Sequence, residues 1–320
     1  MSQIKKNDNN ETNQITNAYF FKLTATYLLM SCQKDEEIEL AVCQNCVSTQ
    51  DYIDFSDSVA TYVRSNIVDS VVLNSSGKTQ AESELGWMDY LAIAAADAAG
   101  AYEGAKIGSL VAPPYGTVVG GVFISAGASW LAYKDCTSGS TSPSSGGEDP
   151  IIKFVYNPFD QSGFEHGKLM NNLFIDSSNT LDLEFNINDL YSRLRDSIGS
   201  TSNGYITYLD VDNTLTQAQF VTAVNDVVTT LNGLDFSNSN DITIFVNALF
   251  DINDRTLVIE YLNEITGFTN YEQVVEYSKE MEAFVLDNTI PGISEDRLLS
   301  FYSVYRGSLP FWSDYKFNNI

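Results

Sequence analysis

The sequence predicts a mainly α-helical protein built around one small-residue helical hairpin, with a helical C-terminal domain and few short strands. Residues 86–133 are dominated by Gly, Ala, Ser and apolar side chains, and form the hairpin. Apolar residues recur three and four apart through most of the second half of the chain, as on one face of a helix. Runs with strand-like alternation are confined to residues 151–156, 181–185 and 205–209.

Composition excludes some partners. The 320 residues can build one large or two ordinary domains, and 44% of them are hydrophobic, as in a folded protein. The 17 basic and 42 acidic residues give a formal charge of −25. Such a field repels nucleic acid and anionic lipid headgroups, so no nucleic-acid partner is expected.

Residues 1–31 have the parts of a secretory signal peptide. Lys5 and Lys6 precede a short apolar run that ends at Met30, and Ser31 and Cys32 follow. This ending resembles a bacterial lipobox, which implies that Cys32 is the lipidated first residue of the mature chain. The next residues, QKDEE, resemble the export signal of surface-exposed lipoproteins in the Bacteroidota. The resemblance implies an exported protein, lipid-anchored at the outer membrane or cell surface; the alternative is a free buried cysteine.

Three further cysteines follow the proposed anchor: Cys43, Cys46 and Cys136. Thiols of exported proteins tend to pair, so a structural disulfide among these three is expected. A redox-active CxxC at 43–46 and a zinc site completed by His166 are the alternatives. His166 is the only histidine and no second ligand spacing supports zinc, so we expect neither a metal nor a cofactor.

The N-terminal region, residues 32–136, contains an expected amphipathic helix at 51–71 and then the hairpin at 86–133. Small residues in the hairpin recur at every fourth position, which places them on one face of each helix. Such a face lets a second helix approach to near backbone contact. The residues expected to make this packing are Gly100, Gly104, Gly108, Gly116, Gly120, Gly121 and Ser125.

The hairpin fits two environments. No charged residue occurs from 107 to 133, and the 19 residues from Tyr115 to Tyr133 approach the roughly 20 that cross a bilayer. The first arm carries Asp89, Asp97, Glu103 and Lys106, which are costly in lipid unless they face a partner or water. The hairpin resembles the glycine-zipper domains of some bacterial envelope lipoproteins and the zipper segments of membrane-active bacteriocins. Burial in the protein's own helical core is the alternative.

A Ser/Gly/Pro-rich linker at residues 137–150 predicts a boundary before a C-terminal helical domain at 151–320. Apolar spacing predicts helices in this domain at 163–174, 187–198, 215–231, 241–250, 255–265, 271–286 and 294–309.

The segment 205–216, YITYLDVDNTLT, resembles the first motif of haloacid-dehalogenase-type phosphotransferases. The resemblance implies that Asp210 is the nucleophile and Asp212 the acid/base. The charge of the phosphoryl group must be met by a Lys and Mg²⁺, but no strand-borne Ser or Thr and no paired Asp at a strand end appear in the segments that follow. We therefore predict that DVDNT at 210–214 is fortuitous, that Thr214 or Thr216 caps the following helix, and that the protein is not an enzyme.

Other candidate sites favour structural roles. The DIND segment at 251–254 lacks the Gly and Glu of a calcium loop and predicts a turn between helices. His166 is expected in a polar turn or helix start without a ligand. The C-terminal aromatic residues suit core packing better than sugar stacking. They are Phe301, Tyr302, Tyr305, Phe311, Trp312, Tyr315 and Phe317.

Two functions follow from these features. The first is an exported, lipid-anchored envelope protein whose hairpin inserts in a membrane or self-associates, with a possible antagonistic role. The second is a binding or structural lipoprotein in which the hairpin is soluble core and another surface meets a protein partner. A phosphohydrolase is a distant third.

Overall fold

The computed structural model describes residues 45–67, 86–136, 153–174, 186–201 and 206–314. These residues are mainly helical, as predicted, and contain no strand; one isolated bridge joins Cys46 to Thr289. The helices are α2 (Thr49–Asn66), α4 (Trp87–Ser109), α5 (Tyr115–Cys136), α6 (Asp160–Phe174), α7 (Ile187–Thr201), α8 (Tyr208–Thr214), α9 (Gln217–Leu231), α10 (Ser239–Leu249), α11 (Arg255–Ile265), α12 (Tyr271–Asp287) and α13 (Glu295–Asp314).

Local side chains fix where several helices begin. Ser48 accepts from the Asp51 N–H, and Asp51 accepts from the Ser48 N–H, which forms a capping box at α2. Thr216 and Gln219 make the same pair at α9, which confirms Thr216 as a cap. These side chains satisfy amide groups that have no partner within the helix.

The prediction of a strand at 205–209 is wrong for the described part of this segment. From residue 208 onward this segment is α8, capped by Thr207, whose side chain accepts from the Asp210 N–H. The alternation of apolar residues is outweighed here by this local cap and by the burial of Ile206 and Val211. Residues 153–156 also form no strand, while 151–152 and 181–185 lie outside the described residues.

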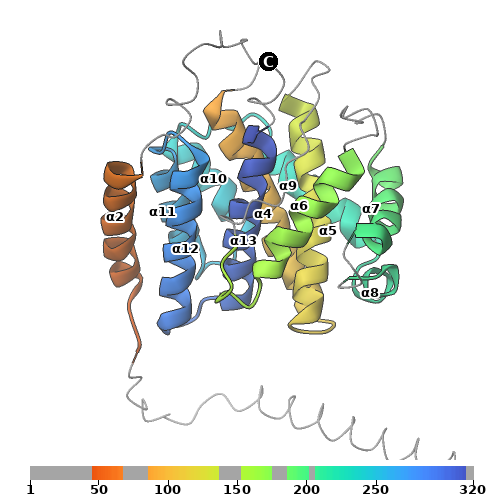
Figure 1. Cartoon of the computed structure of the whole chain (residues 1–320), viewed down its shortest axis with the longest axis horizontal. Helices are drawn as coiled ribbons and strands as arrows, with labels where there is room; N and C mark the ends of the chain where they lie inside the picture. Colours follow the sequence, from red (N-terminus) through yellow and green to blue (C-terminus); the bar gives the residue numbers. More distant parts are fainter. Residues whose placement is uncertain (1–44, 68–85, 137–152, 175–185, 202–205, 315–320) are drawn as a thin grey trace, which may run out of the picture. The chain divides into compact units, whose positions relative to one another are not determined.

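The hairpin lies at the centre of the helical unit. Helix α4 packs along α5, and α13, α6 and α9 pack against the pair (Figure 1). Large side chains from later in the chain cover its small-residue surface; the Trp312 ring stacks on Tyr133 with centroids 4.7 Å apart. Helix α2 packs on α11 and α12, away from the hairpin.

This packing corrects the predicted domain organisation. Residues 45–320 form one compact unit, so the hairpin region and the segment 151–320 are not separate domains. The physical reason is that the hairpin's outer faces are apolar and are buried by helices from the C-terminal half. The predicted linker at 137–150 lies outside the described residues.

Candidate functional site

The facing glycines bring α4 and α5 into backbone contact. A Cβ added at Gly104 would lie well under 3.0 Å from the Gly120 backbone, and one added at Gly108 would clash with Gly116 in the same way. At Gly100 it would lie 2.8 Å from the Cα of Ser125. Real Cβ contacts essentially never come closer than 3.0 Å. Side chains larger than hydrogen would therefore force the helices apart.

The remaining expected packing residue, Gly121, is less tightly held. A Cβ there would lie 3.3 Å from the Ala101 carbonyl oxygen, a contact that a small shift relieves. All the glycines named as packing residues thus lie on the α4–α5 contact, with the tightest approach at the four nearest the hairpin turn.

One described helix has the length and composition to cross a membrane. It is the segment Tyr115–Lys134 of α5, and 89% of its apolar window is buried within the protein. By itself this is the pattern of a core helix as much as of a membrane span.

The turn of the hairpin, in contrast, is exposed and uncharged. We call residues 110–114 the hairpin tip; all five are exposed. The exposed fraction of Leu110 is 83% and that of Val111 is 53%. The two largest apolar side chains of the turn therefore face solvent.

A fully buried polar cluster joins α4, α5, α6 and α13. Ser125 Oγ and His166 Nδ1 lie 2.8 Å apart, and His166 Nε2 lies 3.3 Å from Asp97 Oδ2. The Trp312 indole N–H donates to Asp97 Oδ2 at 3.1 Å, and the Ser308 hydroxyl donates to the same oxygen.

This cluster corrects the expectation for His166. His166 lies within α6 rather than in a polar turn, and it contacts both a serine and an aspartate. The Ser125, His166 and Asp97 side chains are all 0% exposed, so a substrate cannot reach the hydroxyl. The arrangement holds four helices together rather than activating a nucleophile.

A second buried network ties α13 to α12 and α6. The Arg306 guanidinium donates to Asp160 Oδ1 at 2.6 Å and to both Glu282 carboxylate oxygens at 3.1 Å. Burial raises the pKa of Glu282 to about 7, against the opposing charge of Arg306. Such a buried ion pair is costly to break because removal of one partner leaves an uncompensated charge.

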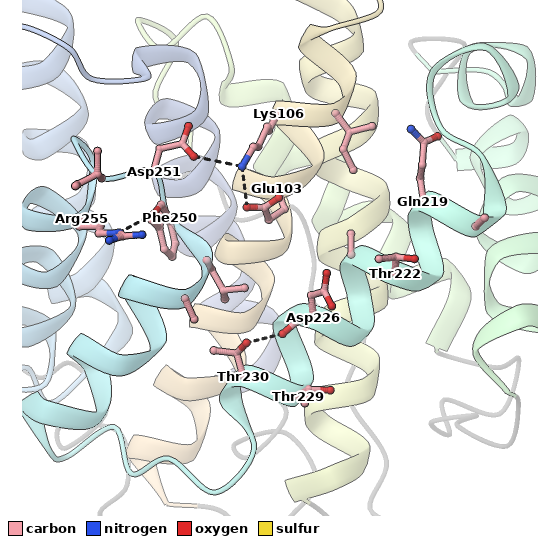
Figure 2. A pocket seen from close by; sticks show the side chains of 16 residues that line it. Glu103, Lys106, Gln219, Thr222, Asp226, Thr229, Thr230, Phe250, Asp251 and Arg255 are labelled. Atoms are coloured by element: carbon pink, nitrogen blue, oxygen red, sulfur yellow. Dashed lines mark hydrogen bonds and ion pairs between the residues drawn. The ribbon is translucent and has the colours of Figure 1, made fainter.

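A further candidate site is a groove of about 940 Å³ between α4, α9 and the turn from α10 to α11. We call it the α4–α9 groove (Figure 2). Both apolar and polar side chains line it. The lining residues are Glu103, Lys106, Ile107, Ala218, Gln219, Thr222, Ala223, Asp226, Thr229, Thr230, Ala248, Leu249, Phe250, Asp251, Ile252 and Arg255.

The two basic groups of the groove differ in how they are held. Lys106 is paired with carboxylates, whereas Arg255 has a hydrogen bond to a backbone carbonyl and no ion-pair partner in the described part of the chain. Figure 2 shows Lys106 between Asp251 and Glu103, with N–O distances of 3.2 Å and 3.7 Å. The Arg255 Nε–H donates to the Phe250 carbonyl at 2.9 Å. Burial raises the pKa of Glu103, while the hydrogen bond from Lys106 helps to hold the pKa of Asp251 low against the effect of burial.

One acidic group in the groove is free. Within the described part of the chain, the exposed Asp226 carboxylate has no ion-pair partner. It points from α9 beside Thr222 and Thr230, whose hydroxyls line the same wall. The lining therefore offers a carboxylate, threonine hydroxyl groups and apolar side chains such as Phe250 and Leu249. The Thr230 hydroxyl already donates to the Asp226 backbone carbonyl at 2.7 Å.

The motif at 210–214 lacks the geometry that its resemblance implies. Asp210 lies in the first turn of α8 and accepts from Thr207 and, at 3.0 Å, from the Tyr115 hydroxyl. Asp212 pairs with the Arg195 guanidinium at 2.6 Å. The two carboxylates stabilise helix packing and follow no strand.

The segment 251–254 connects α10 to α11, as predicted for a turn between helices. Asp254 is fully buried and accepts from the Tyr102 hydroxyl at 2.6 Å, while Asp251 binds Lys106 and Arg297. The turn therefore fixes α4 against α11 and α13 and forms one end of the groove.

Carboxylates that could hold a metal ion meet on α2 and α11. The ligand oxygens of Asp57, Glu260 and Glu264 lie within 4.8 Å of one another. Arg64 pairs with Glu264 at 2.6 Å. Burial, together with the charges of Asp57 and Glu264, raises the pKa of Glu260 to about 7. The raised pKa of Glu260 and the ion pair from Arg64 to Glu264 thus both lower the repulsion among the three carboxylates.

The other predicted residues fall into two groups. Cys46 is disulfide-bonded, but the cysteine side chain to which it is joined lies outside the described part. Cys32, Cys43 and the side chain of Cys136 all lie outside the described part, so the partner of Cys46 stays a prediction. The aromatic residues Phe301, Tyr302, Tyr305, Phe311 and Trp312 are buried in the core, which confirms their packing role; Tyr315 and Phe317 are not described.

Neither the buried polar cluster nor the groove was predicted from the sequence. Their members lie on helices far apart in the chain, and no local motif marks them. Comparison with known protein families, curated proteins and solved structures finds no match to this chain.

Proposed function

We propose that the chain is an exported, lipid-anchored envelope protein and that its helical unit is a binding module with the hairpin as its core. The proposal combines the expected leader at residues 1–31, followed by Cys32, with the way the hairpin is buried. The glycine faces of α4 and α5 are turned toward each other at Gly104 and Gly120, so both are used within the hairpin. This favours internal packing over self-association through those faces.

The charges on α4 favour the same function. Asp97 is bonded to α13, and Lys106 is paired with Asp251. Moving α4 into lipid would break these contacts. A charged side chain at the centre of a bilayer costs about 2.5–3.5 kcal/mol on insertion scales. The first arm of the hairpin is thus suited to a protein core.

The observation that carries the binding role is the α4–α9 groove, which combines apolar lining residues with a free carboxylate at Asp226. Such a site fits a ligand with an apolar body and a cationic group, because specific pockets are mostly apolar with a few placed polar groups. A peptide with alternating basic and apolar residues has this chemistry, and the overall charge of −25 attracts it.

The test is a titration of residues 33–320 with two fluorescent peptides of equal length, one alternating Lys and Leu and one alternating Glu and Leu. We expect the Lys/Leu peptide to bind at least tenfold more tightly, and Asp226→Asn to weaken it several-fold. Asp196→Asn is the matched control, since Asp196 is 76% exposed and lies outside the groove. If both variants lose the same affinity for the Lys/Leu peptide, the preference comes from the net charge of the chain and not from the groove. If neither peptide binds, the groove is not a peptide-binding site.

The anchor has a separate test. Palmitate labelling in a bacterial host is expected to mark the wild-type chain and to be lost in Cys32→Ser. Labelling that survives this substitution would exclude Cys32 as the lipidated residue.

Membrane insertion of the hairpin is the second candidate, and one observation favours it. The segment Tyr115–Lys134 has the length and composition of a membrane span, and the hairpin tip is already exposed. This function requires the surrounding helices to open. Protease digestion with neutral vesicles would then protect residues 107–133 while α2 and α7 are cleaved.

A further inference from the structure

The backbone of the hairpin tip is unusual for an exposed turn. The N–H groups of Val111 and Ala112 both donate to the Gly108 carbonyl, at 3.0 Å and 3.1 Å, and the Leu110 N–H donates to the same oxygen. Pro113 and Pro114 have no N–H. Each residue of the tip therefore has its amide donor either satisfied within the turn or missing.

Carbonyl groups of the tip are also partly satisfied. The Ala112 oxygen accepts from the Gly116 N–H at 2.5 Å, and the Pro114 oxygen accepts from the Val118 N–H at 3.4 Å. In lipid, an unsatisfied backbone group costs several kcal/mol, and this is why exposed turns are rarely stable there. The satisfied amide donors and two of the five tip carbonyls lower that cost, which remains for the carbonyls of Leu110, Val111 and Pro113.

The side chains of the tip match this backbone. Leu110 and Val111 are exposed and adjacent, and no charged residue follows until Lys134. The last charge before the tip, on Lys106, is held by Glu103 and Asp251 rather than facing the turn. The tip is thus an apolar surface without charge on a chain whose formal charge is −25.

We propose that the hairpin tip is a lipid-contact surface that enters the headgroup region of a neutral bilayer while the helical unit stays folded. The occupant is lipid rather than a protein groove because the tip offers no free amide donor to a partner. Neutral headgroups are required, because the field of the chain repels anionic ones. The glycine contacts between α4 and α5 keep the rest of the hairpin in the core, so the contact is shallow.

This contact goes beyond the proposed binding role and has a physical use. One acyl chain gives only reversible membrane attachment, and stable attachment takes a second signal. Contact through the tip would add that signal and would orient the helical unit, and with it the α4–α9 groove, relative to the membrane surface.

The test is flotation of residues 33–320 with phosphatidylcholine vesicles. These residues contain the whole compact unit of residues 45–320 and lack only the leader and the lipidated Cys32. At a high vesicle concentration, a measurable fraction of the wild-type chain is expected to float, since two apolar side chains give only weak partitioning. The double variant Leu110→Asp, Val111→Asp is expected to partition at least about tenfold less, because those two side chains lose their burial.

The matched control is the double variant Leu209→Asp, Ile244→Asp, which adds the same charge at side chains that are 56% and 55% exposed. It is expected to float as the wild type does. Absence of wild-type flotation, or equal flotation of the tip variant, would overturn the proposal; neither result bears on peptide binding in the groove. If the aspartates lower the melting temperature, Leu110→Ser and Val111→Ser repeat the comparison.

Discussion

Replacing Gly104 with alanine tests the close contact at the centre of the fold. In an exposed helix this substitution stabilises by about 0.5–1 kcal/mol, because glycine loses more backbone freedom on folding. At Gly104 the added methyl group would overlap the backbone of Gly120, which has no side chain that can move aside. The two helices must then separate, and overpacking of this kind costs about 1–3 kcal/mol. The overlap with backbone atoms places this cost in the upper part of the range. After the gain of about 0.5–1 kcal/mol is subtracted, we expect a net loss of unfolding free energy of about 1–2 kcal/mol.

The structure offers a matched control on α6. A Cβ added at Gly167 has no atom within 4 Å, so Gly167→Ala should gain about 0.5–1 kcal/mol. Urea unfolding of residues 33–320, followed by circular dichroism at 222 nm, measures both variants. The reasoning fails if Gly104→Ala is as stable as the wild type, since α4 and α5 would then not touch at that position.

Three further predictions follow from the polar contacts. Asp97→Ala should lower the unfolding free energy by about 3 kcal/mol in the same urea assay, because it leaves buried donors on α13 without an acceptor; a loss below about 1 kcal/mol would contradict the buried cluster. The pKa of Glu282 in the folded protein is about 7, above its ordinary value. Between that ordinary value and pH 7, the folded state therefore binds more protons than the unfolded state. The contribution of Glu282 to stability is therefore present near pH 5 and lost as the pH rises through 7; Glu282→Gln should flatten the difference in melting temperature between pH 5.5 and 8, and an unchanged difference would refute this. Asp212→Asn removes an exposed pair with Arg195 and should change the unfolding free energy by less than about 1 kcal/mol, whereas loss of folding would assign it a larger role.

Local patterns predicted much of the fold. The segment 255–265 coincides with α11, and most other predicted helices begin or end within a few residues of the observed ones. Their apolar spacing is visible over two or three turns, and caps such as Thr216 stand next to the helix that they start. These signals come from residues close in sequence, which is why the sequence alone reveals them.

Long-range packing was not predictable in the same way. The Ser/Gly/Pro-rich segment at 137–150 suggested a domain boundary, yet α13 covers α4 from the far end of the chain. His166 contacts Ser125 and Asp97 only because three helices meet around the same point. The α4–α9 groove likewise joins residues from distant segments. In each case the deciding contact depends on how helices pack, and neither spacing nor composition encodes it.

Hydrogen exchange with and without phosphatidylcholine vesicles tests the central claim, that the hairpin is the folded core of the helical unit. The account predicts that amides of α5 are among the slowest to exchange and that vesicles leave the exchange of α2, α12 and α13 unchanged, with any new protection confined to the hairpin tip. Faster exchange in α12 and α13 on addition of vesicles, with α5 still protected, would contradict it, because the bundle would then have opened to release the hairpin into lipid.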